Sequence, residues 1–178
     1  TPDRIFVASF GERHVSPPGS PESPRVESRL IREHFLIVLD AGGRVIEEWP
    51  QVIDLTVHPH SVQISPYDPD RHVWIIDREG HQILKFTNDG RQVTMTLGEK
   101  GVPSDGRQHF NRPADMAFLP DGSFLVADGY TGTRIIKFNE NGQFLTEWGS
   151  KGNSPGEFNL VHCVAVDSKG RVYAADRN

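Results

Sequence analysis

The stretch "FNRPADMAFLPDGSFLVAD" at residues 110–128 returns as "FNLVHCVAVDSKGRVYAAD" at residues 158–176. Phe110 aligns with Phe158, and Asp128 aligns with Asp176, both at an offset of 48 residues. An earlier copy, "HSVQISPYDPDRHVWIID", ends at Asp77, which lies 51 residues before Asp128. The chain therefore repeats a unit of roughly 50 residues, and an internal repeat is the first feature from which a fold should be predicted.

Turn signals divide these repeats into short strands. Five of them contain a glycine preceded by Asp, Asn, Lys or Gly: "DAGGR" (40–44), "NDGR" (88–91), "PDGS" (120–123), "ENGQ" (140–143) and "SKGR" (168–171). Each lies between β-branched or aromatic runs, which is the pattern of a β-hairpin. No segment keeps a 3.6-residue apolar period over three turns, so the sequence predicts an all-β protein.

A period near 50 residues with about four short strands per unit is typical of a β-propeller blade rather than a solenoid turn. Dividing 178 residues by 48 gives about 3.7 blades. Propellers close with about 4 to 8 blades. We therefore expect one propeller domain over residues 1–178, incomplete at its C-terminus, with a Pro/Ser-rich loop insertion at residues 14–28. A compact four-bladed ring is the alternative.

The composition excludes several classes of protein. No apolar run approaches the roughly 18 residues of a membrane-spanning helix. The net charge is -5, and Lys and Arg are scattered singly, so we expect no nucleic-acid partner. The single cysteine, Cys163, excludes an internal disulfide. The chain starts at Thr1 without a signal-like segment. We expect a secreted or periplasmic protein.

Two histidines occupy the same place in alternate repeats. His60 in "VHPHSVQIS" and His162 in "LVHCVAVDS" are 102 residues apart, two repeats of 51, and the position between them is Ala114. Equivalent positions on inner strands surround the channel of a propeller, so the two histidines and a third beyond Asn178 would form a three-histidine site. That arrangement is typical of catalytic zinc with an open position. Alternatively, each histidine only begins a strand and bonds to the backbone.

The blade pattern resembles NHL-repeat propellers and, within them, the peptidyl-α-hydroxyglycine α-amidating lyase family (peptidylamidoglycolate lyase), which is six-bladed. The stretches that carry the resemblance cover residues 36–178: "HPHSVQIS", "VWIIDREGHQILKF", "LGEKGVPSDGRQHFNRPADMAF", "DGYTGTRIIKFNENGQFLTEWG", "SPGEFNLVHCVAV" and "YAADRN". The repeat framework is shared by many NHL propellers. The "DGY" segment, the two histidines and the "ADR" ending narrow the resemblance to the lyases.

The resemblance implies roles for individual residues. His60 and His162 match two of three zinc ligands, and Tyr130 matches a tyrosine that acts as the base. Arg177 matches an active-site arginine that stabilises the phenolate and holds the substrate carboxylate. Val62 matches a residue whose backbone carbonyl binds structural calcium.

One position departs from the family pattern. Phe10 stands where the family has an upstream substrate-binding arginine, and Arg13 is the possible substitute. This departure bears on substrate recognition more than on metal binding.

Two functions follow. The first is a zinc-dependent lyase that cleaves a peptidyl-α-hydroxyglycine-like carbinolamide, a small molecule or a peptide, to an amide and glyoxylate. The alternative is a non-catalytic NHL propeller that binds a protein or a small ligand. A histidine two blades beyond His162 would favour the enzyme.

Other residues are expected to be structural. His58, two residues before His60, is predicted at a solvent-exposed edge, and Cys163 is predicted to be a small core residue facing away from His162. Arg78 either adds positive charge to the channel or belongs to the repeat framework. The recurring aspartates are predicted to cap blade turns: Asp40, Asp77, Asp128 and Asp176.

Overall fold

A computed structural model describes residues 4–9 and 35–177. The chain divides into two compact units, Thr1–Leu55 and Thr56–Asn178. The loop predicted at residues 14–28, together with Phe10 and Arg13, lies outside the described residues. Within the described ranges, no helix is long and apolar enough to cross a membrane. The prediction of one domain over residues 1–178 stays a prediction.

The first unit contains an antiparallel three-stranded sheet in the order β1 (Ile5–Ala8), β2 (Leu36–Leu39), β3 (Val45–Glu48). The all-β prediction missed one short helix, α1 (Val52–Leu55). Four residues fall below the length at which apolar periodicity can reveal a helix. Val52 is fully buried, and Trp49 packs its ring edge against Phe6, with the ring centroids 5.4 Å apart.

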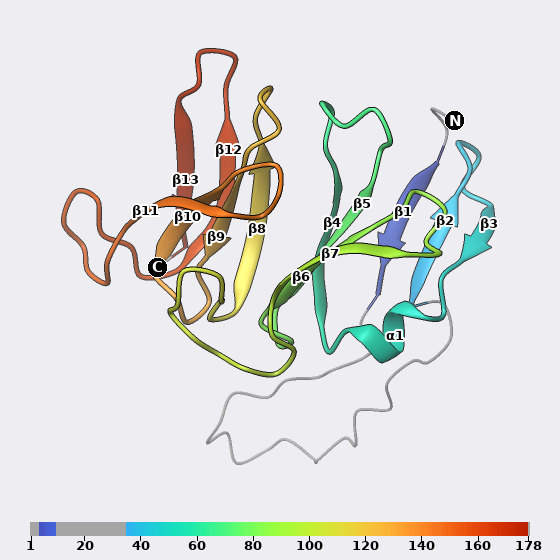
Figure 1. The fold of residues 1–178 in the computed structure, drawn as a ribbon, viewed down its shortest axis with the longest axis horizontal. Helices are drawn as coiled ribbons and strands as arrows, with labels where there is room; N and C mark the ends of the chain where they lie inside the picture. Colours follow the sequence, from blue (N-terminus) through green and yellow to red (C-terminus); the bar gives the residue numbers. More distant parts are fainter. Residues whose placement is uncertain (1–3, 10–34, 178) are drawn as a thin grey trace. The chain divides into compact units, whose positions relative to one another are not determined.

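The second unit consists of three antiparallel sheets, each a meander of strands in chain order (Figure 1). The first is β4 (Pro59–Ile64), β5 (Val73–Asp77), β6 (Gln82–Phe86) and β7 (Val93–Gly98). The second is β8 (Pro113–Phe118), β9 (Phe124–Asp128), β10 (Arg134–Phe138) and β11 (Phe144–Trp148). The third is β12 (Val161–Val166) and β13 (Val172–Asp176). The first strands are neighbours, because β8 contacts both β4 and β12.

All five predicted hairpins are present, at the turns β2–β3, β6–β7, β8–β9, β10–β11 and β12–β13. The glycine of every one of these turns has a positive φ, between 71° and 81°. Only glycine adopts this left-handed conformation without steric cost, which is why each turn signal contains one.

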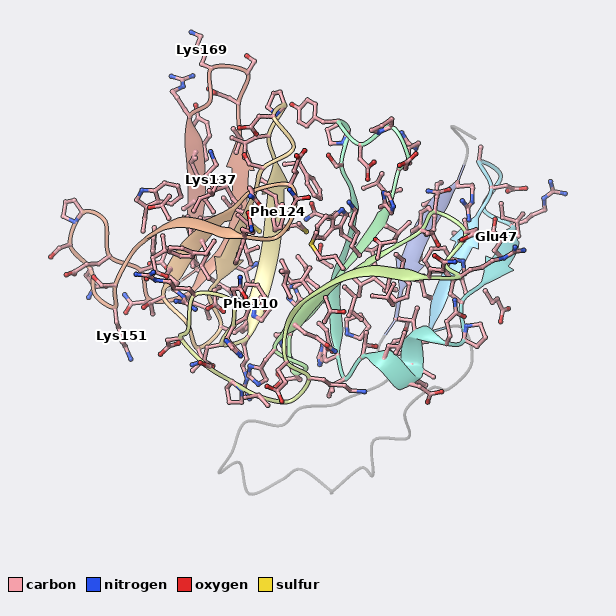
Figure 2. The ribbon with its side chains drawn as sticks, in the orientation of Figure 1. Glu47, Phe110, Phe124, Lys137, Lys151 and Lys169 are labelled. Carbon is pink, nitrogen blue, oxygen red and sulfur yellow. The ribbon has the colours of Figure 1, made fainter. Side chains whose placement is uncertain are left out.

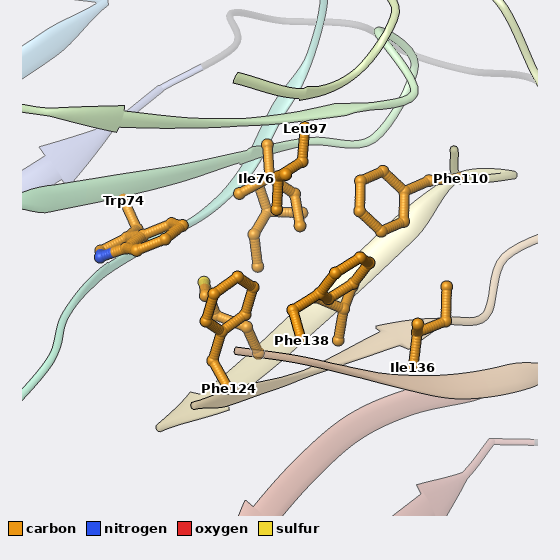
Figure 3. Packing of buried hydrophobic residues seen from close by; sticks show 10 residues of the cluster. Trp74, Ile76, Leu97, Phe110, Phe124, Ile136 and Phe138 are labelled. Atoms are coloured by element: carbon orange, nitrogen blue, oxygen red, sulfur yellow. The ribbon is translucent and has the colours of Figure 1, made fainter. Parts of the chain in front are cut away.

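The middle strands are buried on both faces. On β9, Phe124 and Val126 face the core between the first two sheets, whereas Leu125 and Ala127 face the core toward β12. This alternation follows from the two-residue period of a strand. Figure 3 shows the first core, where Phe124 stacks on Phe138 with the ring centroids 5.4 Å apart. Figure 2 shows Phe124 inside the unit and Lys169 at the tip of the β12–β13 hairpin.

Candidate active site

The first strand of each of the three sheets in the second unit carries a β-bulge at the same place. Pairing of β4 with β5 shifts register between Pro59 and Ser61, and pairing of β12 with β13 shifts between Val161 and Cys163. The extra residues are therefore His60 and His162, and Ala114 is the extra residue of β8. A bulge bends the strand and redirects a side chain, and bulges are frequent next to active sites. The repeated position found by sequence alignment is thus a repeated bulge.

The bulges bring two imidazoles to one hydroxyl. Tyr130, in the turn after β9, places its Oη 3.0 Å from Nε2 of His60 and 2.9 Å from Nε2 of His162. The three rings meet edge to face, and their centroids are 5.2 to 5.3 Å apart. We call these three residues the His–Tyr–His cluster. Sequence reasoning chose all three, and the structure places them together.

The backbone fixes the orientation of His60. Its Nδ1 lies 2.7 Å from the carbonyl oxygen of Ala114, the bulge residue of the neighbouring sheet. Burial lowers the pKa of His60, and its neighbours Arg78 and His162 act in the same direction, against the opposing effect of the Ala114 carbonyl. His60 is therefore neutral at neutral pH, with Nδ1–H donated to Ala114 and a lone pair on Nε2.

A tyrosine hydroxyl carries one proton, which sets the direction of the hydrogen bonds in the cluster. Because Nε2 of His60 accepts, we assign Tyr130 O–H as its donor and Nε2–H of His162 as the donor to Oη. Nδ1 of His162 then accepts from Cys163, whose Sγ lies 3.5 Å away. Partial loss of solvent around the thiol, together with the negative charge of Asp115, raises the pKa of Cys163, so the thiol keeps its proton as a donor.

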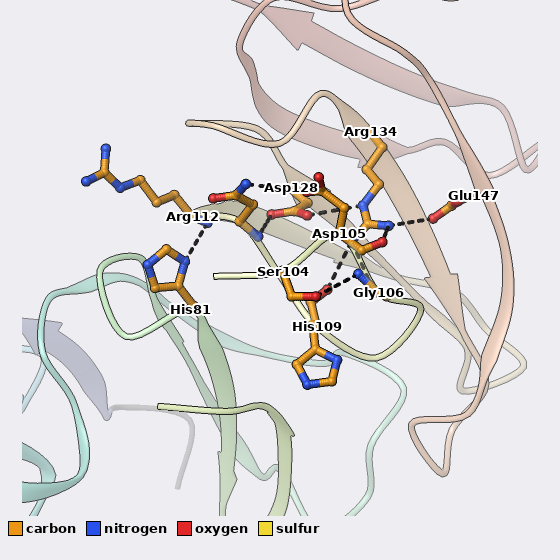
Figure 4. Close-up of polar contacts among 10 residues, drawn as sticks. His81, Ser104, Asp105, Gly106, His109, Arg112, Asp128, Arg134 and Glu147 are labelled. Carbon is orange, nitrogen blue, oxygen red and sulfur yellow. Dashed lines mark hydrogen bonds and ion pairs between the residues drawn. The ribbon is translucent and has the colours of Figure 1, made fainter. Parts of the chain in front are cut away.

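Close backbone packing brings Tyr130 to β12. A side chain on Gly129 would overlap the carbonyl oxygen of Val161, so only glycine permits this approach. The backbone N–H of Tyr130 donates to the carbonyl of Arg112 at 3.1 Å. Asp128, the last residue of β9, fixes the end of this strand. Its carboxylate accepts from the Asn111 backbone N–H at 2.7 Å and from Arg134 at 3.2 Å (Figure 4).

The predicted turn capping is confirmed for Asp40 and for Asp77, which accepts from the Gly80 backbone N–H at 3.2 Å in the turn after β5, and three of the aspartates have a second role. Asp40 caps the β2–β3 turn by accepting from the backbone of Gly42 and Arg44. In contrast, each aspartate at the end of a second strand accepts from backbone N–H groups just before the first strand of its sheet: Asp77, Asp128 and Asp176. These three tie the segment that leads into the bulge to the neighbouring strand.

An arginine that the sequence left undecided lies against the cluster. The guanidinium carbon of Arg78 is 4.5 Å from the centroid of the Tyr130 ring, within the range of a cation–π contact. Arg177 donates its backbone N–H to Leu160 at 2.9 Å, and its side chain is exposed without a hydrogen bond or ion pair to any described residue. Tyr130 and Arg78 are far apart in sequence, so only the folded structure shows that they are in contact.

Two predictions about neighbouring residues are wrong, and the one for Cys163 failed because the bulge at His162 breaks the strand alternation on which it relied. His58 is 3% exposed rather than solvent-facing, and its Nδ1 lies 3.3 Å from Arg78. Cys163 is exposed rather than part of the core, and its sulfur faces His162.

The donor set suits zinc. Two imidazole Nε2 atoms converge on one point, and His60 donates its other N–H to a backbone carbonyl, the contact that ordinarily orients a metal-bound histidine. For metal binding, His162 would present its Nε2 lone pair and turn Nδ1–H toward Cys163. Calcium binding by the Val62 carbonyl, on β4, stays a prediction.

The sheets, their bulged first strands and the repeat define NHL-type β-propeller blades. A solved structure of virginiamycin B lyase from Staphylococcus aureus has the same architecture, with a TM-score of 0.55 at 15% identity, covering 79% of this chain and 41% of that one. At this identity the likeness shows the fold alone. No family model matches the chain.

By its curated relatives, the chain belongs to the NHL-repeat family that includes the peptidyl-α-hydroxyglycine α-amidating lyases. Peptidyl-glycine alpha-amidating monooxygenase B of Xenopus laevis is 33% identical over 182 residues, covering 98% of this chain and 18% of the relative. The probable peptidyl-alpha-hydroxyglycine alpha-amidating lyase pgal-1 of Caenorhabditis elegans is 30% identical over 151 residues, covering 83% of this chain and 42% of the relative. NHL repeat-containing protein 3 of Homo sapiens is 31% identical over 150 residues, with 80% and 42% covered. The chain thus spans less than half of each of these relatives.

Proposed function

We propose that the chain carries part of the active site of a zinc-dependent lyase that cleaves a peptidyl-α-hydroxyglycine-like carbinolamide to an amide and glyoxylate. The convergence of Tyr130 Oη with the Nε2 atoms of His60 and His162 is the observation that supports it best. Relatives named as lyases for this substrate class add support. A structural calcium site at Val62 and a secreted or periplasmic location are proposed with it.

The reaction breaks the C–N bond of the carbinolamide. As the substrate hydroxyl loses its proton, its O–H electron pair becomes the second bond of the glyoxylate carbonyl, and the C–N electron pair leaves with the amide nitrogen. That nitrogen gains the proton, so no other reactant is needed. Tyr130 is placed to take the proton and return it, because its Oη lies within hydrogen-bond distance of both histidines.

His60 and His162 would hold zinc, which supplies Lewis-acid activation of a substrate oxygen when it is bound. Tyr130 has to be deprotonated to act as a base, and tyrosine ordinarily ionises near pH 10. Positive charge beside the ring favours the phenolate. Arg78 supplies such a charge at 4.5 Å from the ring centroid, and Arg177 is the second candidate for this role.

A binding platform is the second candidate, favoured by the likeness to NHL repeat-containing protein 3.

The lyase is tested by measuring glyoxylate release from N-acetyl-α-hydroxyglycine by the intact protein that contains this chain. Release should stop after metal removal with a chelator and return with zinc. Tyr130→Phe should lower the rate roughly 100- to 10,000-fold. His60→Ala and His162→Ala should weaken zinc binding, whereas the matched control His109→Ala should not.

Folded, zinc-loaded protein that releases glyoxylate no faster than the buffer would overturn the lyase and leave the platform. Activity unchanged by Tyr130→Phe would remove this tyrosine as the base while leaving the lyase in place.

A further inference from the structure

Arg78 is held on the Tyr130 ring from several sides. It follows Asp77, the last residue of β5, and its backbone N–H donates to the carbonyl of His58 at 3.0 Å. Its Nη2 lies 3.3 Å from Nδ1 of His58, and its Nε bonds to a Glu79 carboxylate oxygen at 3.1 Å. The side chain is 18% exposed, so it lies at the solvent boundary of the cluster.

Glu79 connects Arg78 to a second arginine. The other oxygen of Glu79 pairs with Arg112 at 3.0 Å. The backbone of Arg112 makes two further hydrogen bonds. Its carbonyl oxygen accepts from the Tyr130 backbone N–H, and its N–H donates to Nδ1 of His81 at 3.2 Å. Its φ of +67° is in the left-handed region, which a non-glycine residue occupies at a cost. A closed circuit therefore runs from the Tyr130 backbone through Arg112, Glu79 and Arg78 back to the Tyr130 ring.

The circuit leaves positive charge beside the cluster. One carboxylate, Glu79, is shared by two guanidinium groups, so it neutralises only one of their two charges. The carboxylate that acts on His60 is Asp115, and its two oxygens already accept from Gln63 and from the Val164 backbone. Among the residues that the structure describes, Nη1 of Arg78 has no hydrogen-bond acceptor.

We propose that Arg78 binds the carboxylate of the ligand that the His–Tyr–His cluster acts on, and so selects for an acid over its neutral analogues. This inference rests on the proposed function and names a specificity-determining residue for it. An arginine whose orientation is already fixed loses little side-chain entropy on binding, and guanidinium–carboxylate hydrogen bonds are strong and directional. Arg177 and Arg13 were the arginines that the resemblance offered for this task.

The test compares two substrates and three variants in the intact zinc-loaded protein. N-acetyl-α-hydroxyglycine and its methyl ester share the reacting carbinolamide and differ in one charge. The assay measures acetamide, because both substrates release it. Arg78→Met removes the charge, Arg78→Lys keeps it without the planar fork, and Arg107→Met is the matched control. Arg107 also lies over an aromatic ring, with its guanidinium carbon 5.2 Å from the centroid of Phe144.

Arg78→Met should slow both substrates through loss of the charge beside Tyr130, and should lower kcat/KM for the acid roughly 10- to 100-fold more than for the ester, with the extra loss mainly in KM. Arg78→Lys should restore part of the loss, and Arg107→Met should behave as wild type. An equal fall for acid and ester would overturn the proposal, since a purely structural role affects both. A wild-type protein with no preference for the acid would overturn it as well.

The binding of unreactive N-acetylglycine separates this inference from the lyase. If the wild type releases no acetamide, the lyase fails, and titration calorimetry with N-acetylglycine and its methyl ester still tests Arg78. Wild-type binding of the acid that is lost in Arg78→Met supports the carboxylate site without the reaction. Equal binding by both proteins, or no binding of the acid by either, overturns it.

Discussion

Gly129 controls how closely Tyr130 approaches His162, because a methyl group there would overlap the Val161 carbonyl oxygen. Backbone atoms cannot yield as a flexible side chain can. Gly129→Ala should therefore push the Tyr130 turn away from β12 and lower glyoxylate release at least 10-fold, since small misplacements of a reacting group are costly. Gly106→Ala is the control, because its nearest contact is the end of the His109 side chain at 3.1 Å. Wild-type rates in Gly129→Ala would show that the turn can adapt.

Burial raises the pKa of Asp128 to about 6, although the Asn111 backbone N–H and Arg134 oppose the shift. The folded protein thus holds this proton more tightly than the unfolded chain does. The stability contributed by the protonated carboxyl is fully present below about pH 4 and is lost as the pH rises through 6. Asp128→Asn has no such titration. Between pH 4 and pH 7, its free energy of unfolding should gain about 2 kcal/mol relative to wild type.

Urea unfolding at a series of pH values measures this difference. A gap between the two proteins that stays constant with pH would contradict a raised pKa at Asp128. The comparison uses the difference between the proteins, so the titration of other carboxylates cancels from it.

At the scale of elements, the turns and strands were predictable from sequence and the bulges were not. Each hairpin glycine occupies a conformation that its neighbours cannot adopt cheaply, so the signal is local. His60, Ala114 and His162 were aligned correctly by the repeat offset, but a register shift depends on the partner strand. The strand alternation used for Cys163 failed at the bulge of β12.

Arg134 ties a loop to the second sheet. Its guanidinium donates to Asp128 and Glu147, and to the backbone carbonyls of Asp105, Gly106 and His109 (Figure 4). Arg134→Met removes all of these bonds and leaves Asp128 buried without its cation. The free energy of unfolding at pH 7 should fall by about 3 to 5 kcal/mol, as expected when one partner of a buried pair is lost.

The cost of Arg134→Met should be smaller at pH 4.5, where Asp128 is largely protonated in the fold and needs no cation. Urea midpoints of wild type and variant at the two pH values check this. Arg171→Met is a suitable control, because Arg171 pairs with Asp167 at an exposed turn. An equal loss at both pH values would indicate that the loop carbonyls, rather than Asp128, account for the effect.

At the scale of the whole molecule, the repeat predicted the blades, because a period near 50 residues reports a sheet that must pack against its neighbours. The site was predictable only in part. His60, His162 and Tyr130 could be chosen from equivalent positions and a family resemblance. Arg78 was left undecided between a charge in the channel and the repeat framework, because its contact with the Tyr130 ring joins two sheets and no local sequence pattern encodes it.

The outer face of the β12–β13 sheet leads to a last prediction. Among the described residues, β13 pairs only with β12, and Val172 and Ala174 line an apolar cavity of about 280 Å³ with Trp148. Val172 is 42% exposed and Trp148 is 46% exposed. Unpaired strand edges beside exposed apolar side chains are templates for association.

Residues 1–178 produced by themselves should therefore self-associate, with a sedimentation coefficient that rises with protein concentration. Val172→Lys places a charge on this face and should shift the protein toward monomer. Val102→Lys, at an exposed residue in the loop after β7, should not. A concentration of about 100 µM is high enough for weak interfaces to form. A wild-type polypeptide that stays monomeric at this concentration would show that this face and edge are too small or too twisted to associate.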